Sequence, residues 1–125
     1  MSNRQGTKAS NSVQITEDHL VVRPRGINAI LSFRRELSFP LKHVRGATVD
    51  DGITDEGKGV RGPGLGLPNA WRGTFTHEGE RTYWNLGRPE RPLVIQLEEE
   101  QFSRLILGVA DPEDLATAIN RSCAQ

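Results

Sequence analysis

The sequence has a single cysteine, Cys123, among its 125 residues. An internal disulfide needs two cysteines, so the fold is expected to form without one, as is usual in a reducing compartment. No stretch approaches the roughly 18 apolar residues of a transmembrane helix. The polar residues 1–12 also lack the apolar core of a secretory signal. These absences predict a cytoplasmic protein with a disordered N-terminal tail over residues 1–12.

The chain also lacks net charge, because sixteen Lys and Arg balance sixteen Asp and Glu. Proteins dedicated to nucleic acids are normally basic, so the balance argues against nucleic acid as a partner. The charges are nevertheless segregated: residues 20–45 are mainly basic and residues 97–116 mainly acidic. We expect the two regions to pair with each other or to form solvated faces, with anion binding by the basic region as the alternative. The run EEE at 98–100 is interpreted as a solvated turn.

Patterns typical of catalysis and metal binding are missing as well. His19, His43 and His77 are far apart in the sequence, which disfavours a zinc site. No serine stands in a nucleophile motif such as G-x-S-x-G, and Cys123 belongs to the apolar face of a predicted helix, where packing is the simpler role. We therefore predict no enzymatic activity, no metal and no cofactor.

The stretch GITDEGKGVRGPGLG at residues 52–66 begins with the G-x-x-x-x-G-K spacing of a phosphate-binding loop. Such a loop needs a Ser or Thr after the lysine and then a helix whose N-terminus faces the phosphates. Here Gly59 follows Lys58, and the glycines and prolines beyond it exclude a helix. We interpret residues 51–72 as a long connecting loop that either packs on the surface or contacts a partner through Leu65, Leu67 and Trp71.

Short apolar runs broken by glycine, proline and aspartate predict β-structure along most of the chain. The clearest hairpin joins residues 73–77 to 81–86, where Trp84 is expected in the core. Residues 26–33 are interpreted as an irregular connection. The predicted strands are residues 13–15 (a short edge strand), 19–23, 36–39, 44–49, 73–77, 81–86, 93–97 and 105–109.

The C-terminal segment changes to a helical period. Asp111 is a good N-cap, and Pro112 at the first helical position loses no hydrogen bond. Apolar residues then recur at helical spacing as far as Cys123. The pattern predicts a helix over residues 111–122 that closes a single domain over residues 13–122.

About seven short antiparallel strands followed by one helix resemble the pleckstrin-homology-like (PH-like) superfold. Several stretches are similar to an uncharacterised family of bacterial PH-like domains. They are ELSFPLKHV at 36–44, GTF at 73–75, YWNLGRP at 83–89, LVIQL at 93–97 and RLILGVADP at 104–112. The resemblance covers residues 18–122. It implies a mainly β (α+β) fold, a small barrel or orthogonal sandwich capped by the helix.

The resemblance implies a non-catalytic interaction module for protein–protein contact or self-association through sheet edges and loops. The alternative is an anionic ligand or membrane surface bound by the basic cluster of residues 23–45, with the arginines Arg23, Arg25, Arg34 and Arg35. Arg34 and Arg35 are adjacent and would point to opposite faces of a strand, which weakens this alternative. A third hypothesis has Phe75, Tyr83 and Trp84 stacking on single-stranded nucleic acid.

Overall fold

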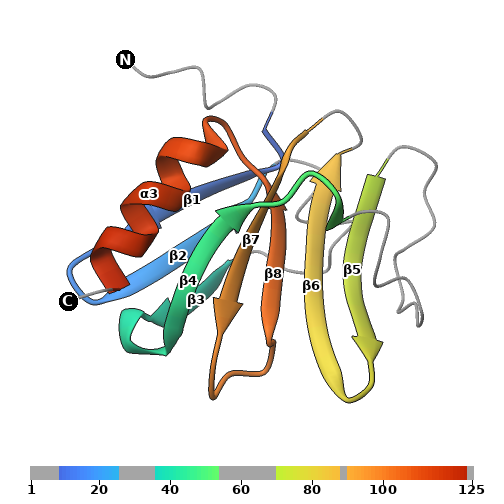
Figure 1. Cartoon of the computed structure of the whole chain (residues 1–125), viewed down its shortest axis with the longest axis horizontal. Helices are drawn as coiled ribbons and strands as arrows, with labels where there is room; N and C mark the ends of the chain where they lie inside the picture. Colours follow the sequence, from blue (N-terminus) through green and yellow to red (C-terminus); the bar gives the residue numbers. More distant parts are fainter. Residues whose placement is uncertain (1–8, 26–35, 54–69, 88–89, 124–125) are drawn as a thin grey trace.

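The computed structural model describes residues 9–25, 36–53, 70–87 and 90–123 (Figure 1). These residues form eight strands in two sheets and one C-terminal helix. The predicted mainly β class with a closing helix is confirmed. Within the described ranges no strand pairing joins the two sheets into a closed barrel, so the arrangement is a small sandwich.

The smaller sheet has the order β1-β2-β3 and is antiparallel. Its strands are β1 (Asn11–Ile15), β2 (His19–Pro24) and β3 (Leu37–Pro40). A tight turn joins β1 to β2, in which the N–H of Thr16 donates to the carbonyl of His19 at 2.9 Å. A single 3-10 turn, η1 (Leu41–His43), leads from β3 into the second sheet.

The larger sheet has the order β4-β7-β8-β6-β5. Its strands are β4 (Val44–Val49), β5 (Ala70–His77), β6 (Glu80–Gly87), β7 (Pro92–Leu97) and β8 (Arg104–Gly108). The predicted hairpin is confirmed as β5–β6. Its two-residue loop has positive φ at Glu78 (54°) and Gly79 (83°), as a type I′ turn requires.

The expectation of purely antiparallel strands was wrong for one pair, because β6 and β8 run parallel. After β6 the chain skips one position in the sheet to place β7 beside β4, and β8 then fills the gap. Because β7 runs opposite to β6, and β8 runs opposite to β7, β8 has the same direction as β6. An order of strands along the sequence does not reveal such a skipped position.

The central strands of the larger sheet are buried on both faces. In β6, Tyr83 packs in the main core with the smaller sheet and the helix, whereas Trp84 belongs to a second apolar cluster with Phe75 and Ile106. This explains why β7 and β8 are nearly continuous apolar runs. Trp84 is 2% exposed, which confirms it as a core residue. Because Phe75 and Tyr83 are buried too, these rings are not available to stack on bases.

The C-terminal helix α3 (Pro112–Cys123) follows the predicted pattern. The N–H of Leu115 donates to the carbonyl of Asp111, so Asp111 takes the N-cap position of the backbone. Ala116 and Ile119 are buried in the core, and Leu115 and Cys123 pack against it. Within the described residues no helix has the length and apolar character needed to cross a membrane.

Two predicted boundaries need correction. Asn11 and Ser12, assigned to the disordered tail, are the first residues of β1, and Asn11 is only 2% exposed because its amide enters a buried hydrogen-bond network. The long loop was predicted to extend to residue 72, but β5 begins at Ala70 and pairs there with Gly87. The remainder of the predicted tail at 1–8, most of the loop at 54–69 and the predicted connection at 26–33 lie outside the described residues.

Candidate functional site

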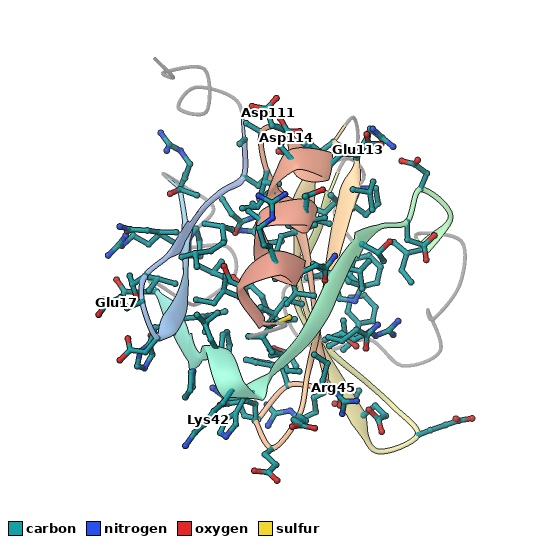
Figure 2. The ribbon with its side chains drawn as sticks, turned by 60° about the vertical axis from the view of Figure 1, so that its left-hand side comes forward. Glu17, Lys42, Arg45, Asp111, Glu113 and Asp114 are labelled. Atoms are coloured by element: carbon teal, nitrogen blue, oxygen red, sulfur yellow. The ribbon has the colours of Figure 1, made fainter. Side chains whose placement is uncertain are left out.

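Two hollows lie along helix α3 on the side that faces the smaller sheet. The first has a volume of about 250 Å³ and lies between β1 and the first half of α3. The second has a volume of about 560 Å³ and lies at the end of the helix, beside the β1–β2 turn and η1. Figure 2 shows α3 between the smaller sheet and β4, with Asp111 and Asp114 at one end of the helix and Lys42 towards the other.

The two hollows share one face of α3, and the first lies beside β1 whereas the second lies just beyond its end. Asp114, Ala118 and Ser122 recur at intervals of four, so they follow one face of α3 from the first hollow to the second. On the strand side, Val13 lines the first hollow, and Glu17 lines the second just beyond the end of β1. Together they make one seam between a strand and a helix, which we call the β1–α3 seam.

Within the described part of the chain, the edge of β1 that faces away from β2 has no strand hydrogen-bonded to it. The N–H of Thr16 donates to the carbonyl of His19, and the N–H of Arg25 donates to the carbonyl of Ser10. These two bonds show that the even-numbered residues here turn their backbone groups towards β2. In an antiparallel ladder the intervening residues turn their N–H and C=O groups the other way, and here these residues include Val13 and Ile15. No hydrogen bond between described residues uses these outward backbone groups. A strand laid beside β1 would therefore find partners for its own backbone.

A buried polar network fixes the start of β1 against the larger sheet. The side-chain amide of Asn11 donates to the carbonyls of Asn85 and Gly108, both at 2.9 Å, and Asn85 donates back to the side chain of Asn11 at 2.8 Å. The carboxylate of Glu90 accepts from the N–H and hydroxyl of Ser10 at 2.8 and 2.6 Å. A Cβ at Gly108 would collide with the Glu90 carboxylate, so a larger residue there would displace this carboxylate from Ser10. The edge of β1 is thus held in a defined position.

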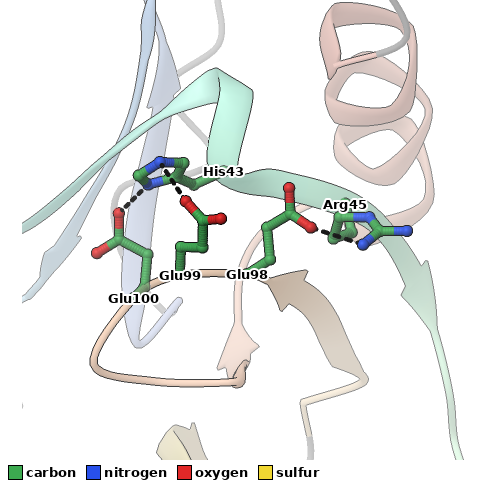
Figure 3. A network of polar contacts seen from close by, with 5 residues as sticks. All are labelled: His43, Arg45, Glu98, Glu99 and Glu100. Atoms are coloured by element: carbon green, nitrogen blue, oxygen red, sulfur yellow. Dashed lines mark hydrogen bonds and ion pairs between the residues drawn. The ribbon is translucent and has the colours of Figure 1, made fainter.

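A second polar cluster, drawn in Figure 3, holds the end of η1. The residues of η1 before it, Leu41 and Lys42, line the second hollow. Nδ1 of His43 lies 2.6 Å from the carboxylate of Glu100, and Arg45 donates to Glu98 at 2.7 Å. The run at 98–100 is therefore not merely a solvated turn, since Glu100 has only 19% of its side chain exposed. The pair of Arg45 with Glu98 confirms that the basic and acidic regions meet at this point.

The acidic groups at the start of α3 are only partly balanced by a cation. Asp111, Glu113 and Asp114 surround the first turn, and Arg91 is the cation that lines the same surface. Arg91 is already engaged, since it donates to Asp51 at 3.0 and 3.1 Å and lies 3.0 Å from Glu113. No ion pair or side-chain hydrogen bond within the described residues engages the carboxylates of Asp111 or Asp114. The first hollow therefore carries unbalanced negative charge.

The second hollow contains polar groups of several kinds. Nδ1 of His19 lies 3.0 Å from Asp18, and this contact keeps the pKa of the Asp18 carboxyl below its ordinary value. The thiol of Cys123 donates weakly to the carbonyl of Asn120. Within the described residues no group of three His, Cys, Asp or Glu side chains is close enough to hold a metal ion. The hollow is shaped by Pro40 and Leu41 and has a charged rim.

The residues predicted as binding sites are only partly covered by the structure. Arg23 donates to Glu36 at 3.0 Å and to Gln14 at 3.2 Å, so the cation already has an acidic partner. Arg25 also has an interaction partner. Trp71 lies in β5 opposite Leu86, but its side chain is outside the described part, and Arg34, Arg35, Leu65 and Leu67 lie outside it altogether. Neither predicted site was the β1–α3 seam.

The sequence contained one signal that points to the seam. The predicted helix is amphipathic, and its first turn contains the acidic residues Glu113 and Asp114. The seam itself depends on residues about 100 positions apart, and no local pattern predicts that β1 lies beside α3. In the comparisons with known proteins, no family model, no curated protein and no solved structure matches the chain.

Proposed function

We propose that this chain is a non-catalytic interaction module of the PH-like kind that binds an extended segment of a partner protein along the β1–α3 seam. The observation that carries the proposal is the open edge of β1 beside a hollow lined by a helix. Strand addition of this type obtains its affinity from main-chain hydrogen bonds and its specificity from pockets for alternate side chains. The two hollows supply such pockets at the two ends of β1.

Two features of the seam support binding rather than mere surface irregularity. The strand that would receive the partner is held at its start by the Asn11–Asn85 network and at its end by the Thr16–His19 turn. A fixed edge loses little conformational entropy when a partner binds, which raises affinity. By contrast, Arg23 is paired with Glu36, so no observation favours the anion-binding alternative over strand addition.

The proposal can be tested by panning a displayed library of random seven-residue peptides on the immobilised full-length chain. Val13→Pro is the informative variant, because the N–H of Val13 points away from β2. Proline there removes an outward donor without breaking a bond to β2, the position where edge strands tolerate proline. Val13→Ala is the matched control for the loss of the side chain. Circular dichroism and thermal unfolding check that both variants fold.

We expect peptides to be enriched on the wild type and on Val13→Ala, and enrichment to be lost on folded Val13→Pro. Enriched peptides titrated into ¹⁵N-labelled protein should perturb amides of β1 and of the facing side of α3. Enrichment that persists on Val13→Pro would place binding elsewhere and rule out strand addition at β1. Absence of any enrichment above a blocked surface would count equally against the proposal.

A further inference from the structure

We infer that the segment bound along the β1–α3 seam carries a basic side chain at the end that lies over the start of α3 and an apolar side chain at the end that enters the second hollow. This inference rests on the proposed function and names the chemistry of the partner.

The basic position follows from the first hollow. Asp111 and Asp114 line it, and its other lining residues are neutral. The nearby cation Arg91 is committed to Asp51 and Glu113, so it does not neutralise these two carboxylates. A Lys or Arg of the partner would add the missing positive charge. The aliphatic stem of such a side chain would lie over Val13 and Leu115, which also line this hollow.

The apolar position follows from the second hollow. Pro40, Leu41 and Cys123 provide its apolar lining, while Glu17, Asp18 and Lys42 carry charges of both signs. This rim contains two carboxylates and one ammonium group, and the apolar lining rather than the charge selects the side chain that enters. The volume of about 560 Å³ accepts a large aliphatic or aromatic side chain.

The spacing of the two positions follows from α3. Asp114 lines the first hollow and Ser122 lines the second, so the two hollows are eight helical residues apart. At about 1.5 Å per residue this corresponds to roughly 12 Å, which an extended partner spans with about four residues at about 3.4 Å each. Side chains of a strand return to the same face every second residue, so partner residues four apart both face the seam. The partner motif is therefore a basic and an apolar residue with three residues between them.

The test uses the same random heptapeptide library and adds two charge reversals, Asp114→Lys and Glu80→Lys. Asp114 lies in the first hollow, whereas Glu80 is an exposed residue at the β5–β6 turn and serves as the matched control. In the pool enriched on the wild type, Lys and Arg should exceed Asp and Glu at one position, with an apolar residue four positions away. Asp114→Lys should abolish or invert this charge preference, and Glu80→Lys should preserve it.

A synthetic peptide from the wild-type pool then gives the magnitude by fluorescence anisotropy. Replacing an attractive exposed ion pair by a repulsive one should weaken its binding to Asp114→Lys by about 3- to 30-fold. The difference from the wild type should shrink at about 0.5 M salt, where charges at the surface are screened. Binding to Glu80→Lys should stay within about twofold of the wild type.

The outcomes separate the two proposals. If Val13→Pro abolishes enrichment but the wild-type pool shows no basic preference, strand addition stands and the basic partner is refuted. If Val13→Pro changes nothing, strand addition itself is refuted. A wild-type chain that sediments as a dimer and becomes monomeric in Val13→Pro would identify a second copy as the occupant of the edge, which would also overturn the assignment of a basic peptide.

Discussion

Helix α3 lies between two edge strands and makes different contacts with each. On the side of β4, the side-chain amide of Asn120 donates to the carbonyl of Ala47 and accepts from its N–H, both at 2.8 Å. These backbone groups point away from β7, so the asparagine replaces the strand that would otherwise pair there. On the side of β1, the corresponding groups of Val13 have no such partner within the described residues. Among the residues that the structure describes, one edge is closed by Asn120 and the other is left open.

The difference shows how an exposed sheet edge can be protected or kept for binding. Unpaired edges invite association, and natural proteins commonly cover them. Here one side chain from the helix covers β4, and Arg91 ties the start of the helix to the same side through Asp51 and Glu113. The helix is therefore fastened towards β4, which leaves room beside β1. The two sides of α3 should therefore differ in how much their contacts contribute to stability.

The largest contrast is expected between two apolar residues of α3. Ile119 is fully buried in the core, and Ile119→Ala should lower the free energy of unfolding by about 2–5 kcal/mol. Leu115 lines the first hollow and is only partly buried, so Leu115→Ala should cost roughly 1 kcal/mol. Urea denaturation measures both values. Equal losses for the two variants would show that the β1 side packs against the helix as tightly as the core does.

A smaller loss is expected when the network that holds β1 is broken. Asn85→Ala removes the hydrogen bonds that the Asn85 side chain donates to the Asn11 side chain and to the carbonyl of Ser10, and it leaves polar groups unpaired, which should cost about 1–3 kcal/mol. Hydrogen exchange should accelerate in β1 more than in β4, because the network anchors only β1. Gln96→Ala, an exposed change on β7, is the control and should stay within about 0.5 kcal/mol. Uniform acceleration of both strands would contradict a local anchor.

The sequence predicted the elements better than their partners. The β5–β6 hairpin and α3 follow from local patterns, the residues around Glu78-Gly79 and the apolar spacing that ends at Cys123, and both are confirmed. The buried start of β1 was missed, because Asn11 is a polar residue whose burial depends on bonds to residues more than 70 positions away. The open edge was missed for the same reason, since only the tertiary arrangement decides that Asn120 covers β4 and that no described residue pairs with Val13.

Asn120 itself provides the next contrast. Asn120→Ala removes both hydrogen bonds to Ala47 and should cost about 1 kcal/mol, a modest loss because water can replace bonds at an exposed site. Ser122→Ala, on the side of the second hollow, should stay within about 0.5 kcal/mol. Hydrogen exchange of the Ala47 amide should accelerate in the first variant only. An unchanged Ala47 amide in Asn120→Ala would show that the side chain does not close this edge.

The smallest effect is a shift in the titration of a single carboxyl group. Hydrogen bonds from Arg91 hold the pKa of Asp51 below its ordinary value of 3.8, and in turn raise the pKa of Arg91. A carboxyl whose pKa is lowered by folding stabilises the fold above its unfolded pKa, and this contribution disappears as the pH falls through the folded pKa. Arg91→Ala should therefore return the pKa of Asp51 towards its ordinary value and remove this acid-sensitive contribution.

NMR titration of side-chain carboxyl shifts measures the pKa of Asp51. Asp18 is the internal control, because it lies on the opposite side of α3, where His19 rather than Arg91 lowers the pKa. A parallel shift of Asp18 would mean that loss of Arg91 disturbs the helix as a whole, and the two sides of α3 would then not be independent.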